Sequence, residues 1–295
     1  MKNQLIAAGI FSVVLSSCST KGALAPTAVS EKLSGGEVQV FDLGGFKLHA
    51  FITADPMGDI SNIIEGKNEA VILEYAAFTA DISAEDGYIQ KLGKPVAKVI
   101  ADYHLAGLEK ISPAQLVLIE GMPEFEKGPV YSGMIANFAA AFFGAMDTSP
   151  HGPAEIAALP SAKNFAGIDF QFSPGPANDF PAASIIIGGK VRYTHWTPAK
   201  AHFSPLQIGD RAAVDAVLED LKKAKASGCV LFTGGHGGGV ARIDAVDFQI
   251  AYLGKVKELL QTCADADGFT AALHQAYPDL AGDDNLSGLA QNLYK

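Results

Sequence analysis

Two runs of short apolar strands, each followed by helices, constrain the fold of this chain more than any other feature. The first run covers residues 38–75 and the second residues 167–193, and glycine-rich turns separate their strands. Alternating apolar and polar residues indicate strands with one buried face, and short turns favour antiparallel hairpins. Helical spacing follows at residues 81–93, 211–226 and 244–262. This order predicts an α+β fold with two sheets packed face to face and helices outside.

The N-terminus resembles a targeting segment. Lys2 precedes an apolar run at residues 5–15 that is too short to span a bilayer. The run ends in a Leu-Ser-Ser-Cys sequence, which resembles a bacterial lipoprotein signal, so we expect cleavage before Cys18 and a lipid on its thiol. The alternative is an ordinary secretory signal with an incidental cysteine. Because Ser19 follows instead of an aspartate, the lipoprotein interpretation predicts the cell envelope, and the outer membrane in a Gram-negative cell.

Composition limits the remaining organisation. Residues 19–36 are rich in Ser, Ala, Gly and Lys and predict a tether, which leaves residues 37–295 for the folded domain. The net charge of −10 argues against nucleic acid as a partner, because phosphate binding needs clustered Lys and Arg. A small-molecule ligand or substrate remains, with no indication of its identity. Cys229 and Cys263 allow two buried thiols or one disulfide, and the sequence does not choose.

The stretch from Val96 to Glu109 carries the first candidate site. Residues 96–101 predict a buried strand, and a helical stretch is expected to follow through Leu108. Asp102 and His104 stand two positions apart just past the strand. Side chains at this spacing project to the same side of an extended segment, so both groups can converge on one ion or one water. The alternative is a histidine that caps a helix and an aspartate paired with a lysine.

A glycine-rich loop at residues 233–239 carries the second candidate site. Five glycines surround His236 directly after a short apolar strand, and glycine lets a backbone approach another group closely. The loop lacks the Gly-Lys-Ser/Thr ending of a phosphate-binding loop and the dinucleotide glycine pattern. A purely structural turn is the alternative.

The other histidines divide into two groups. His195 and His202 lie on a loop with the only tryptophan, whereas the sequence predicts surface positions for His49, His151 and His274. The residues that follow predicted strands are Asp102, His104, His195, His202 and His236. Histidine and carboxylate are the usual ligands of Zn²⁺, and loops that converge on one sheet edge commonly build such sites. The apolar residues 131–146 predict a buried helix or a lid over a pocket.

Local sequences in the same order resemble the metallo-β-lactamase superfamily, over roughly residues 37–262. The segments that carry the resemblance are Asn62-Ile-Ile-Glu-Gly, Ala70-Val-Ile-Leu-Glu74, Val99–Leu108, Gly209-Asp-Arg with its helix, and Cys229-Val-Leu-Phe-Thr-Gly-Gly-His-Gly. The resemblance implies a four-layer αββα sandwich. It also implies metal-dependent hydrolysis at a site built by the Val99–Leu108 loop and the Gly-His-Gly loop. An aspartate usually stands at the position of Glu74.

The superfamily's metal loop, His-x-His-x-Asp-His, is altered in this chain. Asp102 stands for its first histidine and His104 for its second, while Ala106 and Gly107 replace the Asp-His pair. The replaced aspartate is the residue that orients the attacking water in these enzymes. A two-metal site of the usual kind therefore cannot be assembled from this loop.

The other ligand positions are partly retained. No histidine occurs near residues 174–178, where the third ligand is expected, and His195 stands at the position of the bridging aspartate. His236 matches the final histidine. The resemblance thus implies an altered set of Asp102, His104, His195 and His236 for at most one divalent ion, most simply Zn²⁺. Asp102 or an unbound histidine would serve as the base. The alternative is a non-catalytic relative that binds a ligand or partner without metal.

Overall fold

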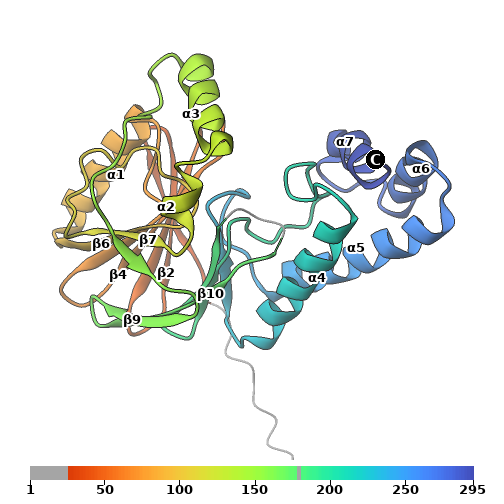
Figure 1. Ribbon diagram of the computed structural model, residues 1–295. Coiled ribbons are helices and arrows are strands. Elements are labelled where there is room, and N and C mark those ends of the chain that lie inside the picture. Colours follow the sequence, from red (N-terminus) through yellow and green to blue (C-terminus); the bar gives the residue numbers. More distant parts are fainter. Residues whose placement is uncertain (1–25, 178–180) are drawn as a thin grey trace, which may run out of the picture.

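The first of two β-sheets is formed by the N-terminal half of the chain in the computed structural model, which describes residues 26–177 and 181–295. Its eight strands lie in sequence order (Figure 1). The strands are β1 Val29–Leu33, β2 Gly36–Asp42, β3 Lys47–Thr53, β4 Ile60–Glu65, β5 Ala70–Leu73, β6 Val96–Ala101, β7 Leu116–Ile119 and β8 Glu155–Ala157. Pairing is antiparallel from β1 to β5 and parallel from β5 to β8.

The second sheet has five strands in the order β13-β12-β11-β10-β9. The strands are β9 Ser161–Phe165, β10 Ile168–Pro174, β11 Ala183–Ile187, β12 Val191–Tyr193 and β13 Leu231–Thr233. Hairpins make the pairings of β9 with β10, β10 with β11 and β11 with β12 antiparallel. The last pair, β12 and β13, is parallel because helix α4, Arg211–Ala226, connects the two strands in the chain.

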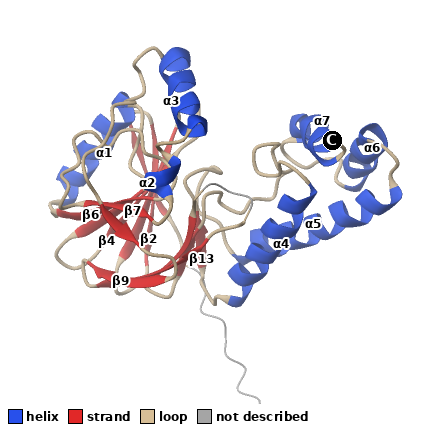
Figure 2. Cartoon of the chain, viewed as in Figure 1, coloured by secondary structure: helices blue, strands red, loops and turns tan. Residues whose placement is uncertain are grey.

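Helices cover both outer faces. Helix α1, Thr79–Leu92, packs on the first sheet through Tyr88 and Ile89, while α4 and α5, Ile243–Thr262, lie beside the second sheet (Figure 2). The remaining helices are α2 Met122–Phe125, α3 Pro129–Phe142, α6 Ala266–Ala276, the short 3₁₀ helix η1 Asp283–Asn285 and α7 Leu286–Leu293. The predicted order of two sheets with helices outside is confirmed, and the layers run α, β, β, α.

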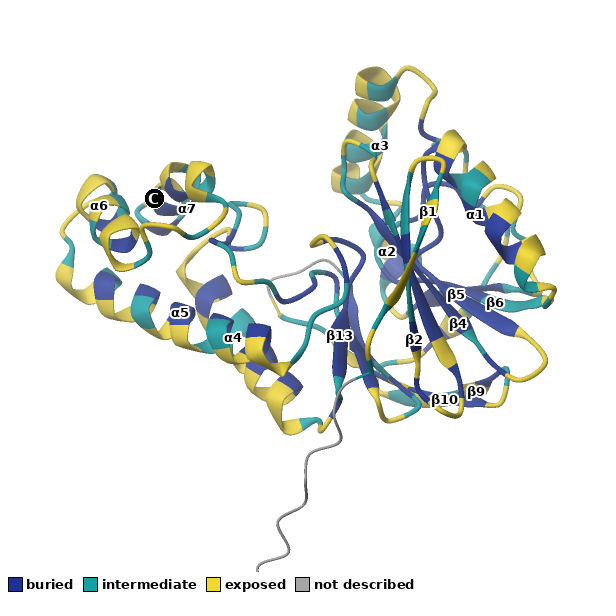
Figure 3. Ribbon diagram, turned by 180° about the vertical axis from the view of Figure 1, so that it is seen from behind, coloured by how far each residue is buried: buried dark blue, intermediate teal, exposed yellow. Residues whose placement is uncertain are grey.

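The apolar side chains form two main cores. The larger joins the two sheets, for example Leu48 and Ile63 of the first with Phe170 and Ile185 of the second, all completely buried. The other holds α4, α5, α6 and α7 together and reaches the second sheet through Phe232. Buried positions accordingly follow the inner faces of the strands and helices (Figure 3). Among the described residues, no helix has both the length and the apolar character needed to cross a bilayer.

Several local predictions differ from the structure. Val29–Leu33, predicted as part of the tether, form β1 because they pair along the edge of the first sheet. The helical stretch expected up to Leu108 is absent, and residues 102–115 form a loop whose Gly107 has a φ of +81°. The predicted signal, including Cys18, lies outside the described residues. Cys229 and Cys263 are both free thiols.

The apolar residues 131–146 are the largest difference. Helix α3 occupies most of this stretch, and none of its residues is buried. It stands away from both sheets (Figure 1). Phe138 and Phe142 pack near Phe78 and Met146, and Tyr131 packs at the margin of the larger core. A run without charge is therefore compatible here with a helix on the surface, so the prediction of a buried helix was wrong.

Candidate metal centre

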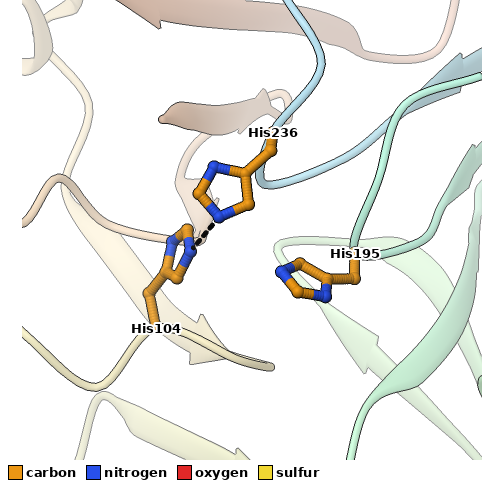
Figure 4. A group of neighbouring side chains, drawn as sticks. All are labelled: His104, His195 and His236. Carbon is orange, nitrogen blue, oxygen red and sulfur yellow. Dashed lines mark hydrogen bonds between the residues drawn. The ribbon is translucent and has the colours of Figure 1, made fainter. Parts of the chain in front are cut away.

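Three imidazoles meet where loops of both sheets converge. His104 lies on the loop after β6, His195 follows β12 and His236 follows β13. One nitrogen of each ring lies within 4.8 Å of the corresponding nitrogen of the other two, and Figure 4 shows the three rings around a common centre. The Nε2 atoms of His104 and His236 are 2.9 Å apart and share a hydrogen bond. The structure thus brings together three of the four predicted ligands.

Glu74 positions His104. This fully buried carboxylate follows β5, and its residue adopts a left-handed backbone with φ of +61°. One oxygen accepts from the backbone N–H groups of Asp102 and Tyr103, at 2.5 and 3.1 Å. The other lies 2.9 Å from the backbone nitrogen of His104 and 3.0 Å from its Nδ1. A single carboxylate therefore fixes both the loop after β6 and the orientation of the His104 ring.

Asp59 has the equivalent position behind His236. Its Oδ1 lies 3.2 Å from His236 Nδ1, and the two backbones form an isolated β-bridge. Burial raises the pKa of Asp59 to about 6. Burial, reinforced by the nearby His104 and His195, lowers the pKa of His236 to about 2. His236 is consequently neutral at pH 7 and retains a nitrogen lone pair, as a metal ligand must.

His195 is oriented by aromatic packing. Its ring stacks on Tyr103, with centroids 3.7 Å apart and an interplanar angle of 28°. Tyr103 itself belongs to the loop that Glu74 holds. The same carboxylate therefore acts on His104 directly and on His195 through one stacking contact.

The glycines of residues 233–239 permit this close arrangement. A Cβ atom on Gly234 would lie 2.5 Å from the backbone nitrogen of Thr197, and one on Gly235 would lie 3.3 Å from Cε1 of His104. Asn62 fixes the loop from the first sheet, since its amide donates to the Gly234 carbonyl at 3.0 Å and accepts from Thr233 at 2.7 Å. These glycines thus let the loop lie close to Thr197 and to His104.

Asp102, predicted as a ligand and as the base, is placed differently. It is completely buried, and its Oδ1 accepts a 2.6 Å hydrogen bond from the backbone N–H of Ala183 on the second sheet. It is not part of the group of converging nitrogens. Although Asp102 and His104 are two positions apart, the chain turns out of the strand between them. Asp102 links the two sheets in this structure.

The positions that would hold a second ion are occupied by packing. Ala106 is buried in a small apolar cluster with Ala77, Phe78 and Met146. Any Cβ on Gly107 would lie 2.2 Å from the carbonyl oxygen of Ala76, which excludes the histidine of the superfamily's loop. The donor set therefore fits one ion and not two.

The three histidines fit a zinc ion. Zn–N bonds of about 2 Å place two tetrahedral ligands about 3.3 Å apart. The His104 and His236 nitrogens, 2.9 Å apart, would have to separate slightly, and the His195 nitrogen, within 4.8 Å of them, would have to move closer. Carboxylates behind ligating histidines fix the ring orientation and the tautomer in zinc proteins. Glu74 lies 3.0 Å from Nδ1 of His104, and Asp59 lies 3.2 Å from Nδ1 of His236 without a hydrogen bond between them. Three nitrogen ligands leave a fourth position for water or substrate.

The remaining histidines lie outside the group of three converging rings. His202 is buried and hydrogen-bonded to Tyr252 at 2.8 Å, away from the three converging rings. His49 was predicted on the surface, but it is buried and bonds Tyr88 and Glu65. His151 is only partly exposed because it bonds Glu126, whereas His274 is on the surface as predicted.

Sequence reasoning missed two carboxylates of the site, Asp59 and Glu74. Each lies next to a predicted strand, directly before β4 and directly after β5. For Glu74 the resemblance gave a second signal, since an aspartate usually stands at its position. Nothing in the sequence relates Asp59 to His236, because the two residues are far apart in the chain.

Comparisons with known proteins identify the fold. No model of a known protein family matches the sequence, and no curated protein matches it. A metallo-beta-lactamase family protein from Thermus thermophilus superposes with a TM-score of 0.57 at 16% identity, over 85% of this chain and 91% of that chain. A beta-lactamase domain protein from Burkholderia ambifaria gives 0.56 at 12% identity, over 86% and 85%. A superfamily protein from Sulfolobus tokodaii gives 0.50 at 12%, over 90% and 99%. The chain therefore has the metallo-β-lactamase fold.

Proposed function

We propose that this chain is a metal-dependent hydrolase with a mononuclear site, in which His104, His195 and His236 hold one divalent ion, most simply Zn²⁺. The observation that carries the proposal is the convergence of three imidazoles with buried carboxylates behind two of them. A zinc ion in such a site supplies a bound water whose pKa is lowered towards neutrality.

The chain's own residues prepare the site for that chemistry. Glu74 holds the loop of His104, Asp59 lies beside the His236 ring, and burial keeps His236 neutral. Tyr103 stacks on His195 and restricts its rotation. We assign Asp102 to the sheet–sheet contact with Ala183 instead of to proton transfer.

Calorimetric titration with Zn²⁺ tests the proposal. We expect one equivalent to bind to the wild type and none to the His104→Ala, His195→Ala double variant. His274→Ala, which removes an exposed imidazole outside the site, should bind like the wild type. Affinity should fall as the pH is lowered, because an imidazole must be deprotonated to bind metal. Absence of binding to the wild type would contradict the proposal.

A non-catalytic ligand-binding protein is the second candidate. It is favoured by the buried Ala106 and by the sterically closed position at Gly107, which remove the superfamily's water-orienting aspartate and a metal ligand. Ligand binding by a wild-type chain that binds no zinc would support this candidate.

We also propose that the chain acts on a small molecule at the cell envelope, anchored by a lipid on Cys18, and at the outer membrane if the cell is Gram-negative. The Leu-Ser-Ser-Cys sequence after the apolar run supports this proposal. Mass spectrometry should show an acylated N-terminus, and Cys18→Ala should abolish membrane attachment. An unmodified Cys18 in a soluble mature chain would contradict the proposal.

A further inference from the structure

A cavity of about 340 Å³ lies between the second sheet and helices α4 and α5. His195 and Trp196 line one part of it, so it adjoins the candidate metal centre without belonging to the ligand set. Most of its wall is apolar: Phe203, Val217, Leu221, Ala224 and Phe232. Its volume falls within the range of small-molecule sites in proteins, which are mostly apolar with a few placed polar groups.

Two buried polar side chains in the wall have unused hydrogen-bonding capacity. Arg192 is 5% exposed, and its terminal nitrogens bond Asp220 and the Ser184 hydroxyl, at 2.7 and 2.9 Å. Its Nε has no hydrogen-bond partner among the described residues, and neither does the hydroxyl of Thr197, which is 3% exposed. Folded proteins rarely leave buried donors unpaired. Both atoms are themselves covered in this structure, so a ligand with a hydrogen-bond acceptor would supply the missing partner after a shift of the side chain towards the cavity.

The charges in the wall define the kind of ligand. Asp220 already neutralises Arg192 through a buried ion pair, so an anionic ligand would face a carboxylate with no cation left to balance it. A neutral acceptor avoids that repulsion and the cost of removing an ionic group from water. Gln249, itself buried, adds a neutral amide to the lining.

We propose that this cavity is a binding site for a neutral carbonyl compound with an apolar chain, such as an alkyl amide or ester. The apolar chain packs against Val217, Leu221 and Phe232, and the carbonyl oxygen accepts from Nε of Arg192 once that side chain turns towards the ligand. Binding at this site does not require a metal ion. A ligand that fills the cavity also lies against His195 and therefore beside the candidate metal centre.

Calorimetric titration of the full chain with octanamide tests the proposal. We expect one molecule to bind per chain, with or without Zn²⁺. Octanoate, which has the same chain but a negative charge, should bind at least about tenfold more weakly. Binding of octanamide to a chain that binds no zinc would support this proposal while contradicting the proposed hydrolase. Zinc binding without octanamide binding would contradict this proposal while supporting the proposed hydrolase.

A pair of variants on α4 locates the site. Val217 lines the cavity, while Leu218, the next residue on the same helix, does not. Val217→Trp should fill the cavity and weaken octanamide binding at least about tenfold, whereas Leu218→Trp should change it less than about twofold. Both positions are half-buried, and circular dichroism checks that both variants fold. Thr197→Val provides a second, conservative test and should weaken binding by a smaller factor. Equal binding by the wild type and Val217→Trp, or no binding up to the solubility limit of octanamide, would overturn the proposal.

Discussion

The two sides of the candidate centre differ in what surrounds them. On one side, the His104 and His236 rings each have a buried carboxylate behind them, Glu74 and Asp59. On the other side, where the superfamily's loop would continue with two more ligands, Ala106 and Gly107 pack against apolar groups and backbone. Buried carboxylates lie beside the converging imidazoles, whereas the following two positions of the loop belong to the packed interior. Under the proposed function, the chain would therefore hold one ion on the first side and none on the second.

Restoring the missing histidine is expected to have the largest effect. Gly107→His places a side chain where φ is +81° and where a Cβ would lie 2.2 Å from the Ala76 carbonyl oxygen. We expect the free energy of unfolding, measured with urea, to fall by more than about 4 kcal/mol. Gly133→Ala, on α3 with no atom near the added methyl, is the control and should not destabilise the chain. A stable Gly107→His variant that binds two zinc ions would show that the second side is still a metal site.

Glu74→Gln tests the supported side. The carboxylate accepts from three backbone N–H groups, and an amide would turn an NH₂ group towards some of these donors. We expect a loss of about 3 kcal/mol in the free energy of unfolding, as for other broken buried polar networks, together with weaker zinc binding. Glu69→Gln, on the exposed turn before β5, is the control and should behave like the wild type. Unchanged stability and zinc affinity would mean that Glu74 does not organise the site.

Glu85 makes the stability of the chain depend on pH. It is completely buried on α1, bonds Ser61 and the Ala76 backbone N–H, and burial raises its pKa to about 8. The folded chain then keeps a proton that the unfolded chain releases near pH 4.5, so stability falls as pH rises between these values. The slope approaches about 1.4 kcal/mol per pH unit.

Denaturation at several pH values tests this account of Glu85. The Glu85→Gln variant keeps the hydrogen-bonding shape of the protonated acid and should lack this fall in stability. The exposed Glu109→Gln variant should follow the wild type across the same range. Parallel curves for the wild type and Glu85→Gln would show that the acid is ionised in the folded chain.

Asp59→Asn should have the smallest effect on stability. Burial raises the pKa of this carboxyl to about 6, so a neutral amide resembles its protonated form, and unlike Glu74 it accepts no hydrogen bond through Oδ1. We expect a loss of about 1 kcal/mol, but a fall in zinc affinity of about 10-fold or more, typical of groups that orient a ligating histidine. A larger loss of stability than for Glu74→Gln would mean that Asp59 contributes more to stability than Glu74 does.

The parts of this structure that were predictable from sequence depend on local patterns. The strands β2 to β6 and the helices α4 and α5 follow from period-two or helical spacing of apolar residues. The three histidines were found because each one follows a predicted strand. The edge strand β1 was missed because its sequence has the composition of a linker.

Partners distant in the chain explain the remaining differences. Asp102 bonds Ala183, 81 residues away, and Asn62 bonds Gly234, 172 residues away. His49 is buried because Tyr88 and Glu65 satisfy both ring nitrogens. Such pairings depend on how the sheets pack, and no local spacing specifies them.

The zinc content and ligand shell of the purified protein test the central claim most directly. Protein prepared without added metal, then incubated with excess Zn²⁺ and desalted, should retain one equivalent by elemental analysis. X-ray absorption at the zinc edge should show three imidazole nitrogens at about 2.0 Å. Retention of two equivalents, or of none, would contradict an account in which His104, His195 and His236 form a single mononuclear centre.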